Sequence, residues 1–76
     1  MKEALTTIIN SLVTDLDAVS IEEIENEKVV TFEVRVAEND MGKVIGKAGR
    51  TAQAIRTIMK ALAAKENKKI TIEFIG

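Results

Sequence analysis

Hydrophobic side chains in the first half of the chain follow two different periods. Over residues 4–16 they recur every three or four positions, as in an amphipathic helix, at Leu5, Ile8, Ile9, Leu12, Val13 and Leu16. Residues 18–25 hold Val19, Ile21 and Ile24 among glutamates, and residues 29–37 alternate, with apolar Val30, Phe32, Val34 and Val36 on one face. Both segments predict strands, the first of them short and exposed. The polar segment Asn26-Glu27-Lys28 between them predicts the turn of a β-hairpin.

The second half of the chain predicts two helices and a final strand. Residues 39–45 form the first helix, because the side-chain oxygens of Asn39 and Asp40 can accept the free N–H groups of a first turn. Residues 50–65 form a longer helix, which Asn67 can end in the left-handed conformation. Its expected buried stripe consists of Ile55, Ile58, Met59 and Leu62. Residues 70–75 alternate again, with Ile70, Ile72 and Phe74 on one side.

The resulting order, α-β-β-α-α-β, predicts an α+β fold in a single domain over residues 1–76. The strand at 29–37 reaches the strand at 70–75 through two helices, and a right-handed crossover sets those two strands parallel. We therefore expect a three-stranded mixed sheet with three helices packed on one face. The other face suits water, since it carries Thr31, Glu33, Arg35, Thr71 and Glu73.

The amino-acid composition excludes several classes of protein. The chain has no Cys and no His, so disulfide scaffolds, Cys or His zinc sites and thiol or imidazole catalysis are impossible. No serine has a histidine to activate it. The carboxylates of residues 15–27 do not match a calcium loop, because Val19 occupies the third ligand position; we interpret them as a solvated strand edge. We expect no enzyme, cofactor or metal site.

The sequence carries no mark of a membrane or secreted protein. No stretch approaches the roughly 20 apolar residues of a membrane span, and the first residues lack the apolar core of a signal peptide. A cytoplasmic address is therefore expected.

A small net charge conceals two oppositely charged halves. Residues 1–40 carry three basic and ten acidic side chains, a charge of −7, whereas residues 41–76 carry eight basic and two acidic ones, a charge of +6. Residues 41–60 hold five bases and no acid. Such a block creates an attractive field for an anion, although a basic block can also be a solvated helix face.

Two glycines break this basic block between the two predicted helices. Gly46 and Gly49 enclose Lys47 and Ala48, with Lys43 one turn earlier and Arg50 directly after. A tight turn at the start of a helix offers backbone amides and the helix dipole to an anion, so phosphate is the natural ligand. The alternative is a plain connection in which glycine only lets the chain reverse. A P-loop is excluded by its spacing and by the Ala after Lys47.

The segment Val44-Ile45-Gly46-Lys47-Ala48-Gly49 resembles the core of a KH domain, whose hallmark is a GXXG loop between two helices. The element order is similar to the type II arrangement of that fold. The stretch from Asp40 to Ala52 and the length of the chain resemble the KhpA family of small bacterial proteins with a single KH domain.

This resemblance implies a non-catalytic protein that binds single-stranded RNA, with about four nucleotides in a groove. Gly46, Lys47, Ala48 and Gly49 would clamp the backbone, and Lys43 and Arg50 would contact flanking phosphates. Val44, Ile45, Ile70 and Ile72 would lie by the apolar groove or in the core beneath it. The family suggests a post-transcriptional regulator or RNA chaperone that bears on bacterial cell shape. Single-stranded DNA binding requires the same loop chemistry and remains an alternative.

A second function is also open. Ala54, Ile58 and Ala61 form a stripe of small residues around one isoleucine, which would let a second copy approach the helix at 50–65. The alanines could equally just favour the helix. The KhpA resemblance implies a homodimer and a larger RNA-binding partner with its own KH domain, so a dimerising protein-interaction module is the alternative function.

Overall fold

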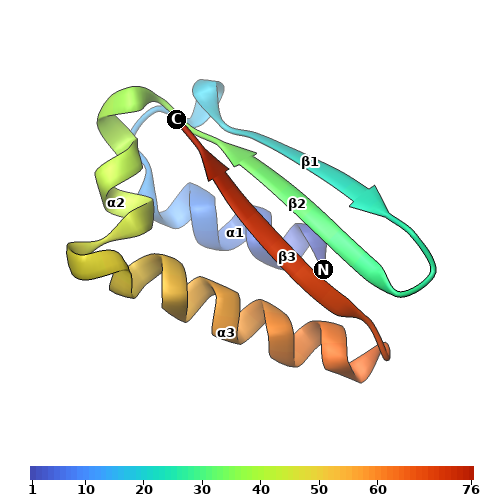
Figure 1. Ribbon diagram of the computed structural model, residues 1–76. Coiled ribbons are helices and arrows are strands. Elements are labelled where there is room, and N and C mark those ends of the chain that lie inside the picture. The colour runs from blue at the N-terminus through green and yellow to red at the C-terminus, as the bar shows by residue number, and fades with distance from the viewer.

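The computed structural model describes all 76 residues and confirms the predicted order of elements. Figure 1 shows the chain from its N-terminal helix to its C-terminal strand. The elements are α1 (Lys2–Leu12), β1 (Ser20–Glu25), β2 (Val29–Arg35), α2 (Met41–Ile45), α3 (Arg50–Lys65) and β3 (Lys69–Ile75). None of the helices combines the length and the apolar character that a membrane span requires.

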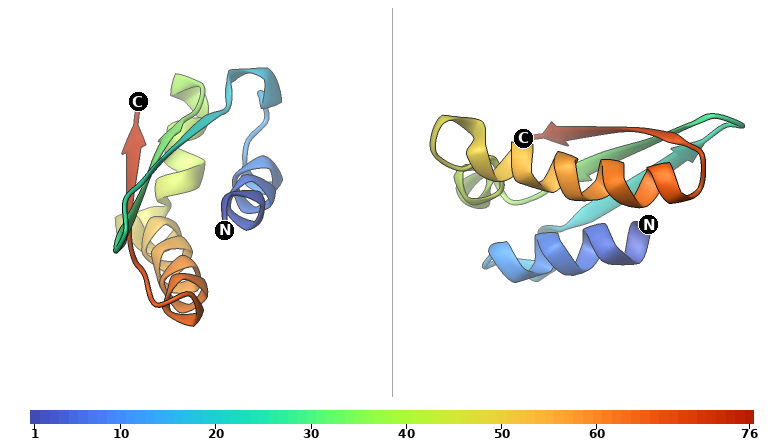
Figure 2. Two further views of the ribbon diagram at one scale, coloured as in Figure 1. Left: turned by 90° about the vertical axis from the view of Figure 1, so that its right-hand side faces the viewer. Right: turned by 90° about the horizontal axis from the view of Figure 1, so that it is seen from below.

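The three strands form one mixed sheet in the order β1-β2-β3. β1 pairs with β2 in the antiparallel sense and β2 pairs with β3 in the parallel sense, as the crossover predicts. All three helices lie on one side of the sheet, and its other face is open (Figure 2). The expected two-layer α+β architecture is therefore confirmed, and β3 is an edge strand.

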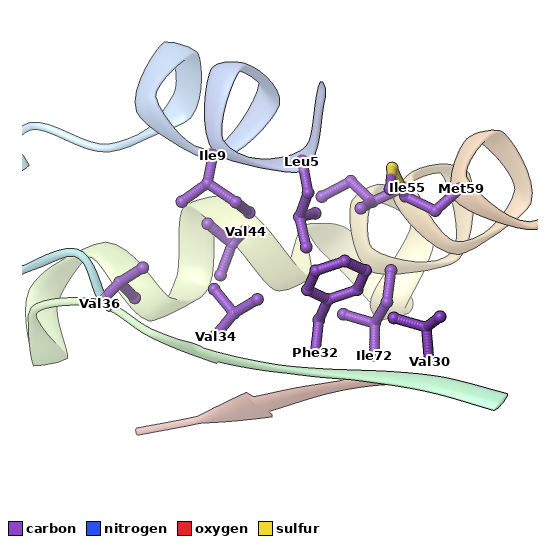
Figure 3. Close-up of a cluster of buried hydrophobic side chains, with 10 residues drawn as sticks. All are labelled: Leu5, Ile9, Val30, Phe32, Val34, Val36, Val44, Ile55, Met59 and Ile72. Carbon is purple, nitrogen blue, oxygen red and sulfur yellow. The ribbon is translucent and has the colours of Figure 1, made fainter. Parts of the chain in front are cut away.

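The hydrophobic core fills the space between the sheet and the three helices (Figure 3). Phe32 of β2 is fully buried at its centre, beneath Leu5 of α1 and Met59 of α3. Burial of one such side chain contributes about 1.5–3 kcal/mol, so these contacts hold α1 and α3 against the sheet. The whole cluster is Leu5, Ile9, Val30, Phe32, Val34, Val36, Val44, Ile55, Met59 and Ile72.

The first helix is shorter than its apolar stripe predicts. It ends at Leu12, because Val13 has an extended backbone with φ −91° and ψ 159°. Leu16 then lies in a 3₁₀ turn and is 56% exposed, so its expected place in the buried stripe is wrong. The cause is a tertiary contact: the next two N–H groups, of Thr14 and Asp15, donate to the Asp40 carboxylate.

The buried face of α3 also differs from the sequence prediction. Ile58 is 50% exposed, whereas Ala52 and Ala63 are buried together with Ile55 and Met59. The helix is rotated so that alanines, not the larger isoleucine, face the interior, because small side chains let a helix approach its neighbours closely. The end of α3 is as predicted. Asn67 has a φ of +59° and follows the last turn.

Candidate nucleic-acid interface

The loop between α2 and α3 is a tight, internally hydrogen-bonded turn. Gly46 has φ 78° and ψ 173°, and residues Lys47–Gly49 form a single 3₁₀ turn. The Gly46 N–H donates to the Gly42 carbonyl at 2.9 Å, and the Gly49 N–H donates to the Gly46 carbonyl at 3.1 Å. Ala48 and Gly49 both adopt the left-handed conformation before α3 begins at Arg50. In Figure 1 this loop lies at the end of the molecule where α2 meets α3.

The loop backbone packs directly on the first turn of α3. A Cβ atom added to Gly46 would lie 2.2 Å from the Oγ1 atom of Thr51 and 2.8 Å from its backbone nitrogen. A side chain at position 46 is therefore excluded twice, by the positive φ of the backbone and by the atoms of Thr51 that fill the space for a Cβ atom. A Cβ atom on Gly49 would meet nothing within 4 Å, so that side of the loop is open to an incoming partner.

Positive side chains gather around this loop. Lys47 and Arg50 are exposed, and neither forms an ion pair. Lys43 is 49% exposed, and its Nζ atom lies 3.5 Å from a carboxylate oxygen of Asp40. The amino end of α3 adds the partial positive charge of a helix terminus. The residues that the sequence predicts around the loop are thus brought together, and the arrangement favours an anion such as phosphate.

The two aliphatic residues before Gly46 differ in their surroundings. Val44 is fully buried in the core cluster, while Ile45 is half-buried and packs against that cluster. In β3, Ile72 is buried and Ile70 is half-buried. Of these four positions, Ile45 and Ile70 therefore retain accessible surface for a ligand, whereas Val44 and Ile72 chiefly form the core beneath it.

Asp40 anchors the N-terminal end of α2 instead of capping it. Its side chain makes no cap bond to α2, contrary to the sequence prediction. The carboxylate is fully buried and accepts hydrogen bonds from the N–H groups of Asp15 and Thr14, at 3.0 and 3.1 Å, and from the Thr14 hydroxyl at 2.8 Å. These bonds lower the pKa of Asp40 to about 2, against the effect of burial. The start of α2, and hence the loop that follows it, is tied to the end of α1.

A groove runs between α3 and β3, which lie side by side and point in opposite directions in Figure 1. One part of it is a cleft of about 200 Å³ lined by Arg56, Lys60, Ile70, Thr71 and Ile72. A further hollow of about 310 Å³ shares Lys60 and Ile70 and adds Lys68 and Lys69. We call these two cavities together the α3–β3 groove. α3 starts at the glycine loop and its later turns line the groove, so this helix connects the loop to the groove.

Arg56 joins the two walls of this groove. Its Nη2 atom donates to the Ile72 carbonyl of β3 at 3.2 Å, and its guanidinium carbon lies 5.2 Å from the centre of the Phe74 ring. Arg56 is accordingly half-buried against β3 and does not extend freely into solvent. The helical period could have indicated this, since Ala52, Arg56 and Lys60 are four residues apart and Ala52 is buried.

The stripe of small residues lies on another side of α3. Ala54, Ile58 and Ala61 are all exposed, and none of them lines the α3–β3 groove. Arg56 and Ile58 are two positions apart, which turns their side chains by about 200° around the helix axis. The groove and the stripe are therefore separate surfaces of the same helix.

Known proteins of similar sequence match nearly the whole chain. RNA-binding protein KhpA of Clostridium acetobutylicum is 52% identical over 75 residues, which cover 99% of this chain and 100% of that one. The protein of the same name from Chlamydia trachomatis is 39% identical over 75 residues, covering 99% and 96%.

Solved structures share the fold at low sequence identity. Era in complex with MgGDPNP and nucleotides 1506–1542 of 16S ribosomal RNA superimposes with a TM-score of 0.67 and 18% identity. A crystal structure of Aquifex aeolicus Era gives a TM-score of 0.66 at the same identity. In both cases the match covers 95% of this chain and 28% of the other. This likeness supports the type II KH fold that the element order predicts.

A comparison with protein families agrees with the relatives. The family described as KhpA/KhpB, KH domain, matches residues 2–74. Its span includes the glycine loop, the α3–β3 groove, β1, β2 and all of β3 except Ile75. The resemblance that the segment Val44–Gly49 carries is confirmed, and the chain belongs to the KH-domain family of KhpA and KhpB.

Proposed function

We propose that this protein binds single-stranded RNA without catalysing a reaction, and that Gly46–Gly49 clamps the phosphate backbone. One observation carries the proposal: the glycine loop packs on the first turn of α3 while Lys47 and Arg50 extend freely beside it. The names of the relatives, RNA-binding protein KhpA, support an RNA ligand and a non-catalytic role.

The chemistry of the loop suits a phosphate rather than a base. The strand would approach the open side of Gly49, where no side chain blocks the backbone. The helix terminus and the cations of Lys47 and Arg50 would then stabilise the negative charge. Lys43 would contribute less, because Asp40 already neutralises part of its charge.

The cleft beside Arg56, one part of the α3–β3 groove, would accept the bases next to the clamped phosphates. Ile70 and Ile72 supply an apolar wall, whereas Arg56 and Thr71 supply polar groups. Phe32 is fully buried, and Phe74 is half-buried with the Arg56 guanidinium over its ring. Bases would therefore meet aliphatic side chains and hydrogen-bonding groups instead of the aromatic platforms that many single-strand binders use.

The biological setting follows from the family. We propose a cytoplasmic post-transcriptional regulator or RNA chaperone that affects bacterial cell shape. Single-stranded DNA offers the same phosphates to the loop, so direct competition between RNA and DNA strands of equal sequence decides between the two ligands. RNA should compete better if groups of the groove contact the 2′-hydroxyls.

A second candidate function is pairing through α3. Ile58 is 50% exposed on a helix whose other large aliphatic residues are buried or half-buried. With Ala54 and Ala61 beside it, Ile58 offers an apolar contact at which a second backbone can approach closely. We propose that this stripe forms a homodimer, or docks the KH domain of a larger RNA-binding partner, while the groove on the other side of α3 stays free.

The decisive experiment reverses the charge of the loop. The double variant Lys47→Asp/Ala48→Asp should bind a single-stranded oligonucleotide at least tenfold more weakly in fluorescence anisotropy, because two carboxylates now face the phosphates. The variant Lys2→Asp/Asn10→Asp is the matched control, since it makes the same charge change at exposed positions of α1. Circular dichroism verifies both folds. Equal RNA affinity of the loop variant and the control would reject the clamp.

A further inference from the structure

The α3–β3 groove does not end at the cleft beside Arg56. Its larger hollow, of about 310 Å³, is lined by Lys60, Lys68, Lys69 and Ile70. We call these four residues the lysine hollow. Three of the four are cations, whereas the smaller cleft nearer the middle of α3 has two cations among its five lining residues. Positive charge therefore becomes denser along the groove as it leads away from the glycine loop.

Two of these lysines have no partner within the protein. Lys68 forms an ion pair with Glu25 at the end of β1, so its charge is largely compensated. Lys60 and Lys69 are exposed and form no ion pair. Glu66, the acidic residue nearest in sequence, is exposed in the turn after α3 and does not line the hollow. The hollow thus keeps two uncompensated positive charges above the apolar side chain of Ile70.

The distance between the glycine loop and the lysine hollow sets how long a nucleic-acid strand must be to contact both. Lys60 lies ten residues after Arg50 on α3, which corresponds to about 15 Å along the helix axis, and Lys69 lies beyond the end of that helix. With its bases stacked at about 3.4 Å, as along one strand of a duplex, a segment of four nucleotides covers only about 14 Å. A strand stacked in this way and clamped at the loop has to continue past its fourth nucleotide to bring a phosphate to Lys69.

We propose that the lysine hollow is a second phosphate-binding position, which holds the continuation of a nucleic-acid strand whose other part lies at the glycine loop. Lys60 and Lys69 act as mobile point charges on one or two phosphates, and Ile70 contacts the adjoining sugar or base. The proposal rests on RNA binding at the loop and extends it. The protein would bind a segment longer than four nucleotides and contact its phosphates near each end of α3.

A series of strand lengths tests this proposal. Oligouridines of four and ten nucleotides are titrated into the wild-type protein, into Lys60→Gln/Lys69→Gln and into the loop variant Lys47→Asp/Ala48→Asp. The variant Lys2→Gln/Arg35→Gln is the matched control, because it removes two exposed cations that line neither part of the groove. Circular dichroism verifies every fold, and affinities are measured at several salt concentrations.

The expected result is a loss confined to the long strand. Lys60→Gln/Lys69→Gln should bind the ten-nucleotide strand about tenfold more weakly than the control variant does, whereas binding of the four-nucleotide strand should weaken much less, because only Lys60 of the pair also lines the cleft beside Arg56. The slope of log affinity against log salt for the long strand should become shallower by about 1.4, which corresponds to two phosphate contacts. In wild-type NMR spectra, the signals of Lys68 and Lys69, which line only the lysine hollow, should shift only with the long strand.

Other outcomes separate this proposal from the loop clamp. If the loop variant loses all binding but Lys60→Gln/Lys69→Gln binds the long strand as tightly as the control variant does, only the lysine hollow is rejected. If the loop variant binds the short strand normally while Lys60→Gln/Lys69→Gln weakens the long one, the hollow stands and the clamp is rejected. Hexaglutamate probes an acidic protein partner: if it binds as tightly as RNA with the same lysine dependence, the RNA assignment of the hollow is overturned. No binding of either strand to the wild type rejects both.

Discussion

Gly46 and Gly49 both have positive φ values, of 78° and 75°, but a side chain would be disfavoured for different reasons at the two positions. Gly46 combines its φ with an extended ψ of 173°, a region that is essentially restricted to glycine, and Thr51 fills the space that a side chain would need. Gly49 lies in the ordinary left-handed region with open space around it. Ala48, between them, adopts that region with a Cβ atom. The loop therefore tolerates a side chain near its tip and not at its entrance.

Substitution of each glycine by alanine should separate these constraints. Gly46→Ala should lower the free energy of unfolding by about 2–4 kcal/mol, because backbone strain adds to a clash with α3. Gly49→Ala should lower it by about 1–2 kcal/mol, the cost of the left-handed conformation alone. Urea denaturation measures both values. Equal losses for the two variants would contradict the close packing of Gly46 on Thr51.

Among the elements, α3 contributes to the most surfaces. Ala52, Ile55, Met59 and Ala63 face the core, Arg56 and Lys60 line the groove with β3, and a third side carries the exposed stripe around Ile58. A helix of 16 residues can present three such sides because its side chains advance by 100° per residue. The proposed RNA contact and the proposed pairing are thus compatible on one helix, and substitutions should alter each without the other.

Charge placed on the exposed stripe tests the proposed pairing. Ile58→Asp and Ala61→Asp should convert a dimer into a monomer in sedimentation equilibrium, because a carboxylate cannot be desolvated in an apolar contact. Both positions are exposed, so the loss of folding stability should stay below about 1 kcal/mol, close to the difference in helix propensity.

The matched control for the pairing test is Gln53→Asp, an exposed position of α3 outside the stripe, which should leave the dimer intact. A wild-type chain that sediments as a monomer at every concentration would reject a homodimer. Variants that remain dimeric would mean that another surface pairs.

The molecule as a whole separates its charges between two faces. Glu22, Glu33 and Glu73 stand in register on three neighbouring strands, on the face that the helices leave open. With the exception of Lys65, the cations of the second half of the chain line the groove or surround the glycine loop instead. Like charges at neighbouring positions repel each other and also any polyanion. The acidic face would therefore direct a nucleic acid towards the opposite side of the protein.

The buried carboxylate of Asp40 links the segment after α1 to the start of α2, and its effect should be visible in the stability of the whole fold. The depressed pKa of Asp40, about 2, means that its stabilising effect is fully present above the unfolded value of about 3.9. This contribution is lost as the pH falls through 2. Asp40→Asn should accordingly be less stable than the wild type at pH 7, and the difference should shrink between pH 4 and pH 2.

The measurement is chemical denaturation of both proteins across that pH range. Asp17→Asn serves as the control, because Asp17 is exposed and forms no side-chain hydrogen bond. A pH-independent difference between the wild type and Asp40→Asn would mean that the hydrogen bonds to Asp40 do not depend on its charge.

The amino-acid sequence by itself determined the order of the elements, the parallel pairing of β2 with β3 and the place of the glycine loop. These features rest on local periods, on turn residues and on the handedness of crossovers, all of which act over short stretches of chain. The same local logic identified Asn67 as the end of α3, where its φ is +59°. It also brought Lys43, Lys47 and Arg50 to one loop.

Only the tertiary structure decided the end of α1, the rotation of α3 and the composition of the groove. Leu16 continues an apolar stripe, yet Asp40, 24 positions later in the chain, draws the backbone out of the helix two residues beyond Leu12. The side of α3 that faces the core was set by how closely the helix packs, which favoured Ala52 over Ile58. Arg56 and Lys60 reach the groove for the same reason. Close packing makes the position of one residue depend on residues that are distant in sequence. A local sequence pattern cannot predict this dependence.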